Sequence, residues 1–145
     1  MYKFLKELHS GFRYVVFLLI VLALVQALIG LFAKKPYTET NRKINLFAMI
    51  SVHIQLLLGL ILYFYSPFVN FRNMGAAMKD AMIRYWTVEH LVMMIFAMIL
   101  ITVGHSRSKK ALDLFKHRSI AIYYGLAILV ILAAIYQSGR PILGM

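Results

Sequence analysis

Four long apolar runs alternate with short polar segments along the chain, and this pattern is the first indication of the fold. A helix needs about 20 predominantly apolar residues to cross the hydrocarbon core of a bilayer. Each of the four runs reaches that length. We therefore predict four membrane-spanning helices, with approximate bounds 8–33, 44–65, 85–104 and 119–138.

The first polar connection, Lys34–Lys43, carries clear signals for the end of one helix and the start of the next. Pro36 cannot continue a helix, and Thr38, Thr40 and Asn41 are natural caps for the helix that follows. The third connection, after residue 104, is strongly basic. Both segments are predicted to lie outside the membrane.

The longest connection separates the second and third apolar runs and contains a regular pattern of methionines. Met74, Met78 and Met82 recur at every fourth position, with charged residues such as Lys79 beside them. This spacing is typical of a short amphipathic helix on a membrane surface. We predict such a helix over about 73–84.

Composition supports a membrane protein of the all-α class. Of the 145 residues 62% are hydrophobic and only 14% are charged, and the mean hydropathy is +0.78. Soluble domains do not have this composition. Short connections predict one integral membrane domain over residues 1–145, a four-helix up-down-up-down bundle.

The charges are unevenly distributed. The chain has 16 Lys and Arg against 5 Asp and Glu, but the basic residues lie in short loops and form no continuous basic face, so nucleic-acid binding is not expected. Nine of them follow the first and third helices and seven lie at the opposite ends, which favours cytoplasmic loops and periplasmic termini in a bacterial inner membrane. The chain has no cysteine, which excludes disulfides, thiolate metal sites and covalent haem attachment.

Ionisable groups inside membrane spans are costly and usually functional. His53, Glu89 and His90 fall within the predicted spans, and four more groups lie nearer the boundaries: His9, Arg13, His105 and His117. Glu89 can orient a histidine, carry protons, or pair with Arg13 or Arg84. His105 and His117 are expected to contact lipid headgroups.

Histidines in an apolar bundle are good ligands for haem iron, provided that two rings lie at similar heights. At about 1.5 Å per residue, His90 can pair with His9 or with His53 after a shift of about two helical turns. Arg13 shares a face with His9 and could neutralise a haem propionate. His105 lies about 22 Å from His90 along their helix, at the membrane boundary, so one haem b is favoured and two remain open.

Two alternatives to haem remain. Met74, Met78 and Met82 could hold copper(I), a soft ion that prefers thioethers, with His9 nearby. In that case the chain would handle copper or haem. Otherwise it would be a non-catalytic structural subunit of a larger membrane complex, with its histidines hydrogen-bonded inside the bundle.

Five segments carry a resemblance to known proteins: YKFLKELH at 2–9, HSGFRY at 9–14, VHIQLLLG at 52–59, VEH at 88–90 and GHSRSKK at 104–110. Together they resemble short four-helix membrane proteins of Bacteroidetes-type bacteria that are generally labelled cytochrome b. The opening segment is also distantly similar to membrane-integral protoporphyrinogen oxidase and to the copper-resistance protein D group.

The resemblance to cytochrome b implies a b-type haem held by histidines, and His9, His53 and His90 are the positions carried over. Electron transfer is expected rather than the breaking of substrate bonds. Membrane lipid is the expected surrounding, and a quinol or a redox partner protein is the expected source or acceptor of electrons. A homo-oligomer also remains open.

Overall fold

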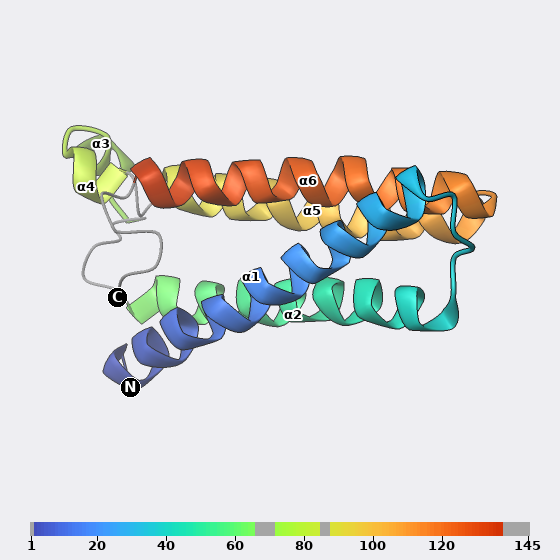
Figure 1. The fold of residues 1–145 in the computed structure, drawn as a ribbon. Coiled ribbons are helices and arrows are strands. Elements are labelled where there is room, and N and C mark those ends of the chain that lie inside the picture. Colours follow the sequence, from blue (N-terminus) through green and yellow to red (C-terminus); the bar gives the residue numbers. More distant parts are fainter. Residues whose placement is uncertain (1, 66–71, 85–87, 138–145) are drawn as a thin grey trace.

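The computed structural model describes residues 2–65, 72–84 and 88–137, and the regular structure in these ranges is helical (Figure 1). The helices are α1 Tyr2–Phe32, α2 Glu39–Tyr65, α3 Met74–Ala77, α4 Ala81–Arg84, α5 His90–Lys110 and α6 Asp113–Gln137. Of these, α1, α2, α5 and α6 are long and apolar enough to cross a membrane. The predictions of an all-helical fold and of four such helices are confirmed.

The four long helices lie alongside one another. Helix α1 packs against α2 and α6, and α5 packs against α6 and α2. In Figure 1 the α1–α2 and α5–α6 connections lie at one end of the molecule, which we call the loop end (residues 33–38 and 111–112). The start of α1 lies at the other end, as do α3 and α4.

Each long helix extends beyond its predicted apolar segment at one end at least. Helix α1 begins at Tyr2, α2 begins at Glu39, and α5 continues to Lys110. The reason is that hydropathy locates only the apolar part of a helix. Lys, Arg and Glu are good helix formers and continue it into the polar region. His105 therefore lies inside α5 and not in a loop.

Reciprocal hydrogen bonds cap the start of α2. The Thr38 N–H donates to Asn41 Oδ1 at 2.9 Å, and the Asn41 N–H donates to Thr38 Oγ1 at 3.2 Å. This is the capping-box geometry, which satisfies two backbone donors at a helix start. Of the three predicted caps, Thr38 and Asn41 are confirmed, whereas Thr40 lies inside the helix.

The end of α1 is a tight turn with an unusual residue at its centre. Lys34 adopts a left-handed conformation, with φ 53°, and the Lys35 N–H donates to the Gly30 carbonyl at 3.0 Å. This is a Schellman motif, in which the left-handed position is usually glycine. The turn directs the chain back across the end of the bundle.

The predicted amphipathic helix over 73–84 is divided in two in the structure. Asn73 Oδ1 accepts the Ala76 N–H at 3.1 Å and caps α3, and Asp80 Oδ1 accepts the Ile83 N–H at 3.2 Å and caps α4. An aspartate that caps a new helix favours a break in the preceding one. The segment is therefore two single turns.

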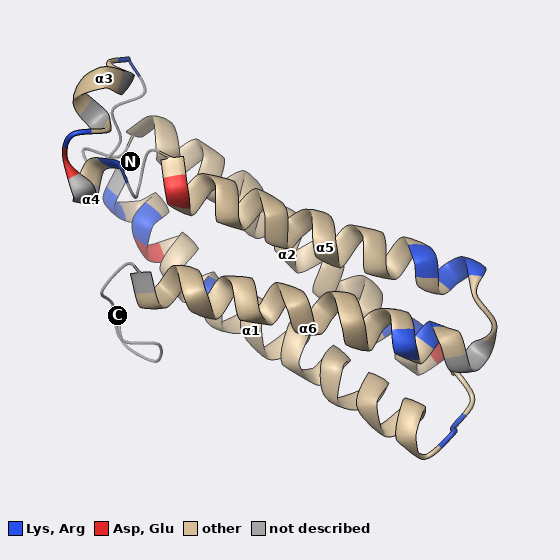
Figure 2. Ribbon diagram, turned by 90° about the horizontal axis from the view of Figure 1, so that it is seen from above, with Lys and Arg blue, Asp and Glu red and all other residues tan. Residues whose placement is uncertain are grey.

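Small and branched apolar side chains fill the core between the long helices. Ile20, Ala23, Ala48, Ile101 and Tyr124 are fully buried. Alanines at these positions let the helix backbones approach closely. Large apolar side chains cover much of the outer surface of the long helices, and Figure 2 shows Lys and Arg gathered toward the helix ends.

Candidate functional site

His9 lies between α1 and α2, against a glycine. The ring is half-buried, and a Cβ added at Gly59 would lie 3.2 Å from His9 Cε1. Gln55 Nε2 donates to the His9 carbonyl at 2.8 Å, which ties the same turn of α1 to α2. One turn later, Arg13 Nη2 donates to the Tyr14 hydroxyl at 3.1 Å.

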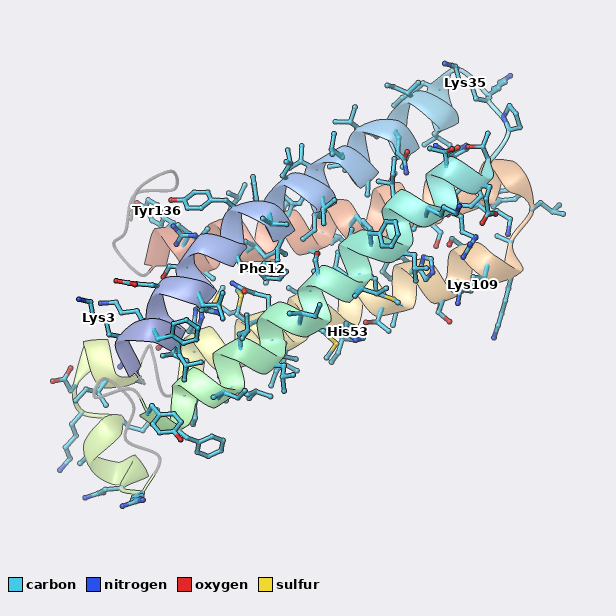
Figure 3. The ribbon with its side chains drawn as sticks, turned by 90° about the horizontal axis from the view of Figure 1, so that it is seen from below. Lys3, Phe12, Lys35, His53, Lys109 and Tyr136 are labelled. Carbon is cyan, nitrogen blue, oxygen red and sulfur yellow. The ribbon has the colours of Figure 1, made fainter. Side chains whose placement is uncertain are left out.

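His53 lies on the exposed surface of α2, where it bridges to α5 (Figure 3). Its Nε2 is 2.8 Å from Thr102 Oγ1. The Thr102 hydroxyl in turn donates to the Met98 carbonyl at 2.7 Å. Because the hydroxyl proton is directed at Met98, Nε2 of His53 is the donor in the first bond. His53 is therefore level with position 102 of α5.

The heights of the histidines follow from this contact. Thr102 is twelve residues after His90, about 18 Å along α5, and only three residues before His105, about 4.5 Å. His53 therefore lies much closer in height to His105 than to His90. The pairing of His53 with His90 that the sequence suggests would have to span about 18 Å.

Glu89 lies beside the half-buried His90 at the start of α5 and is engaged in an ion pair. Arg84 Nε is 2.8 Å from Glu89 Oε1. Of the roles predicted for Glu89, pairing with Arg84 is confirmed. This pair links α4 to the start of α5.

The predicted copper ligands are only partly within the described structure. Met78 is half-exposed in the turn between α3 and α4. The side chains of Met74 and Met82 lie outside the described part. Across residues 2–65, 72–84 and 88–137, no group of three or more His, Asp or Glu could hold a metal ion.

A network of polar side chains joins three helices at the loop end. Gln26 Nε2 donates to the Asn41 carbonyl and to Asn45 Oδ1, each at 3.0 Å, and Asn41 Nδ2 returns a bond to Gln26 Oε1 at 2.9 Å. Asn45 Nδ2 donates to the Tyr37 hydroxyl at 2.8 Å, and the buried Tyr124 hydroxyl donates to the Asn45 carbonyl at 2.7 Å. The sequence analysis did not predict this network, and polar residues near the ends of apolar runs, Gln26 and Asn45, are the signal that could have indicated it.

His117 of α6 is fully buried next to this network. Its ring packs directly on Gly30 of α1, and its Nε2 lies 3.1 Å from the Lys35 carbonyl, to which it donates. The Tyr37 ring meets it edge-on at 5.2 Å between centroids. The expectation that His117 contacts lipid headgroups is therefore wrong, because the α1–α2 turn covers the ring.

A cavity of about 400 Å³ adjoins His117 at the loop end. The polar residues that line it are Gln26, Lys35, Thr38, Asn41 and His117. Ile29 and Pro36 form its apolar side.

His105 is the histidine that the sequence placed at the membrane boundary and that the structure buries most completely. Its side chain is 1% exposed, and neither Nδ1 nor Nε2 has a hydrogen-bond partner among the described residues. The expected headgroup contact is wrong, because the ring is covered by other parts of the protein. A neutral imidazole has one donor and one acceptor, and leaving a buried polar group without a partner costs about 1–3 kcal/mol.

Comparison of the chain with protein-family models, with curated proteins and with solved structures finds no match.

Proposed function

We propose that this chain is a multi-pass protein of a bacterial inner membrane that binds b-type haem through histidine and carries electrons. Four helices of membrane-spanning length and an apolar outer surface support the membrane location. The position of the α1–α2 and α5–α6 connections at one end supports an up-down-up-down bundle (Figure 1). The excess of basic residues at that end supports an orientation with both termini in the periplasm.

The observation that carries the haem proposal is the ring of His105. It is buried inside a candidate membrane span with both nitrogens unpartnered in the described structure. A buried polar group of this kind requires an explanation, and a bound group is one of the few available. Haem iron accepts a neutral imidazole nitrogen and would relieve this cost.

His53 is the second ligand that the geometry favours. It belongs to the neighbouring helix α2 and is level with Thr102, less than one helical turn from His105. Because Nε2 donates to Thr102, Nδ1 is the nitrogen left for iron, and the same bond ties α2 to α5 at this height. A bound haem would supply one-electron transfer, and the bundle would contribute ligands and an apolar surrounding.

Spectra of three histidine variants test this proposal. The purified, dithionite-reduced protein is expected to show the sharp alpha band of a haem with two histidine ligands. His105→Ala should lose most of the haem, whereas His53→Ala should retain haem in a high-spin form. His9→Ala is the matched control at the opposite end of the bundle and should keep the parental spectrum.

The same measurements can reject the proposal. A protein without a Soret band, even after reconstitution with haemin, would not be a cytochrome. Loss of haem in His9→Ala, with His105→Ala unchanged, would return the site to the ligand set expected from the sequence.

A structural-subunit role remains the second candidate, and the position of His53 favours it. The His53 ring is exposed on a helix of membrane-spanning length, where a neighbouring subunit would cover it better than lipid. In that case cross-linking in native membranes would capture a partner near position 53. If the protein contains no haem and its complex still assembles in the His53→Ala and His105→Ala variants, these rings neither bind haem nor contact a partner subunit.

A further inference from the structure

The loop-end cavity has the character of a site for an anionic group. Among the described residues that line it there is no carboxylate, and the basic residue Lys35 is one of them. Lys35 makes no ion pair within the described part of the chain. A strongly hydrated ammonium of this kind is a natural partner for phosphate oxygens.

Neutral polar residues line the same space. Asn41 Nδ2 carries two hydrogens and the described structure records an acceptor for one of them, Gln26 Oε1. Thr38 also lines the cavity, and its hydroxyl donates to Asn41 Oδ1 at 2.9 Å, so the second Nδ2 hydrogen of Asn41 is the donor left for a ligand. Their mutual hydrogen bonds hold both side chains in place before any ligand arrives.

One side of the cavity opens onto an apolar stripe of α1. Ile29 lines the cavity and is half-exposed, and Val25 and Phe32 are exposed at four and three residues from it. Residues at this spacing lie on one face of a helix. A ligand with a charged head in the cavity and an apolar tail would extend along this stripe.

The positive charge of the whole loop end also favours an anionic ligand. Nine basic residues lie in or beside the two loop-end connections. In the same segments the acidic residues are Glu39 and Asp113, and Glu39 is engaged by Arg42, whose Nε donates to it at 3.0 Å. Basic pockets between helix ends at a membrane surface attract anionic lipid headgroups.

We propose that this cavity binds the phosphate group of an anionic phospholipid, with Lys35 as the principal cation and the acyl chains along Ile29. The site is separate from the proposed haem ligands. It would fix the α1–α2 turn, and with it the cover over His117, at the bilayer surface.

Thermal unfolding in a neutral detergent tests the site. Phosphatidylglycerol at tenfold excess over its dissociation constant should raise the unfolding temperature by about 3–5 °C, and phosphatidylcholine should leave it unchanged. Lys35→Gln should lose at least half of the shift. Lys110→Gln is the matched control, because Lys110 is a basic residue at the same end that does not line the cavity. This variant should show the full shift in unfolding temperature.

A second readout counts bound lipid directly. Native mass spectrometry should detect phosphatidylglycerol on the parent protein and on Lys110→Gln, and less of it on Lys35→Gln. Equal shifts with the two lipids, or equal losses in the two variants, would overturn the proposal in favour of diffuse charge attraction. A full shift with inorganic phosphate alone would overturn the lipid as the source of the phosphate.

Discussion

Individual histidines differ in what surrounds them, and the surroundings determine what each ring can do. His105 is buried without a hydrogen-bond partner in the described structure, whereas His117 is equally buried but donates to the Lys35 carbonyl. His53 is exposed and bonded to Thr102. Of these three rings, only that of His105 lacks a hydrogen-bond partner among the described residues, so it is the strongest candidate for a ligand.

Gly30 is a residue whose replacement should lower the stability of the protein. A Cβ at Gly30 would overlap the His117 ring, which the Lys35 carbonyl and the Tyr37 ring hold in position. Gly30→Ala should therefore destabilise the protein by about 1–3 kcal/mol, the usual cost of overpacking. Circular dichroism during thermal unfolding in detergent would measure the change.

Gly11 provides the matched control. A Cβ there would meet nothing within 4 Å, so Gly11→Ala should be neutral or stabilising by up to about 1 kcal/mol through helix propensity. Equal unfolding temperatures for the two alanine variants would contradict the tight contact between Gly30 and His117.

Among the elements, the connection between α1 and α2 contributes most to the loop end. Its Schellman turn directs Lys35 back over His117, and the capping box at Thr38 then starts α2. The sequence correctly predicted that Thr38 caps α2. It could not predict the cavity, because the cavity depends on how α6 packs beside this turn.

The left-handed residue in this turn leads to a stability prediction. The left-handed conformation of Lys34 costs about 1 kcal/mol in steric strain, which glycine would avoid. Lys34→Gly should therefore stabilise the protein by about 0.5–1 kcal/mol, measured by thermal unfolding. Lys34→Ala keeps the Cβ and removes the rest of the side chain with its charge, so an equal gain from alanine would show that strain at this position is not the cause.

Across the whole molecule, charge and hydropathy are segregated. The middle of the bundle is apolar outside as well as inside, and the Lys and Arg side chains lie toward the ends (Figure 2). This arrangement suits a protein that crosses a bilayer four times. The proposed orientation depends on a small excess of basic residues at the loop end.

Because the chain has no cysteine, single cysteines can report its orientation. In intact spheroplasts, a membrane-impermeant maleimide should label Lys3→Cys but not Lys110→Cys. Permeabilising the membrane should expose Lys110→Cys. The reverse pattern would show the opposite orientation. Labelling of both positions from outside would contradict three membrane crossings, by α1, α2 and α5, between them.

The sequence by itself determined the class of protein, the four apolar helices and the capped start of the second one, because run length and turn chemistry are local properties. It could not determine which histidines lie inside. Helices that are apolar around their whole circumference have no marked polar face to show which side is buried. Tertiary packing decided that His105 and His117 are covered, that His53 is exposed and that Gln26, Asn45 and Tyr124 form one network, since each depends on contacts between distant segments.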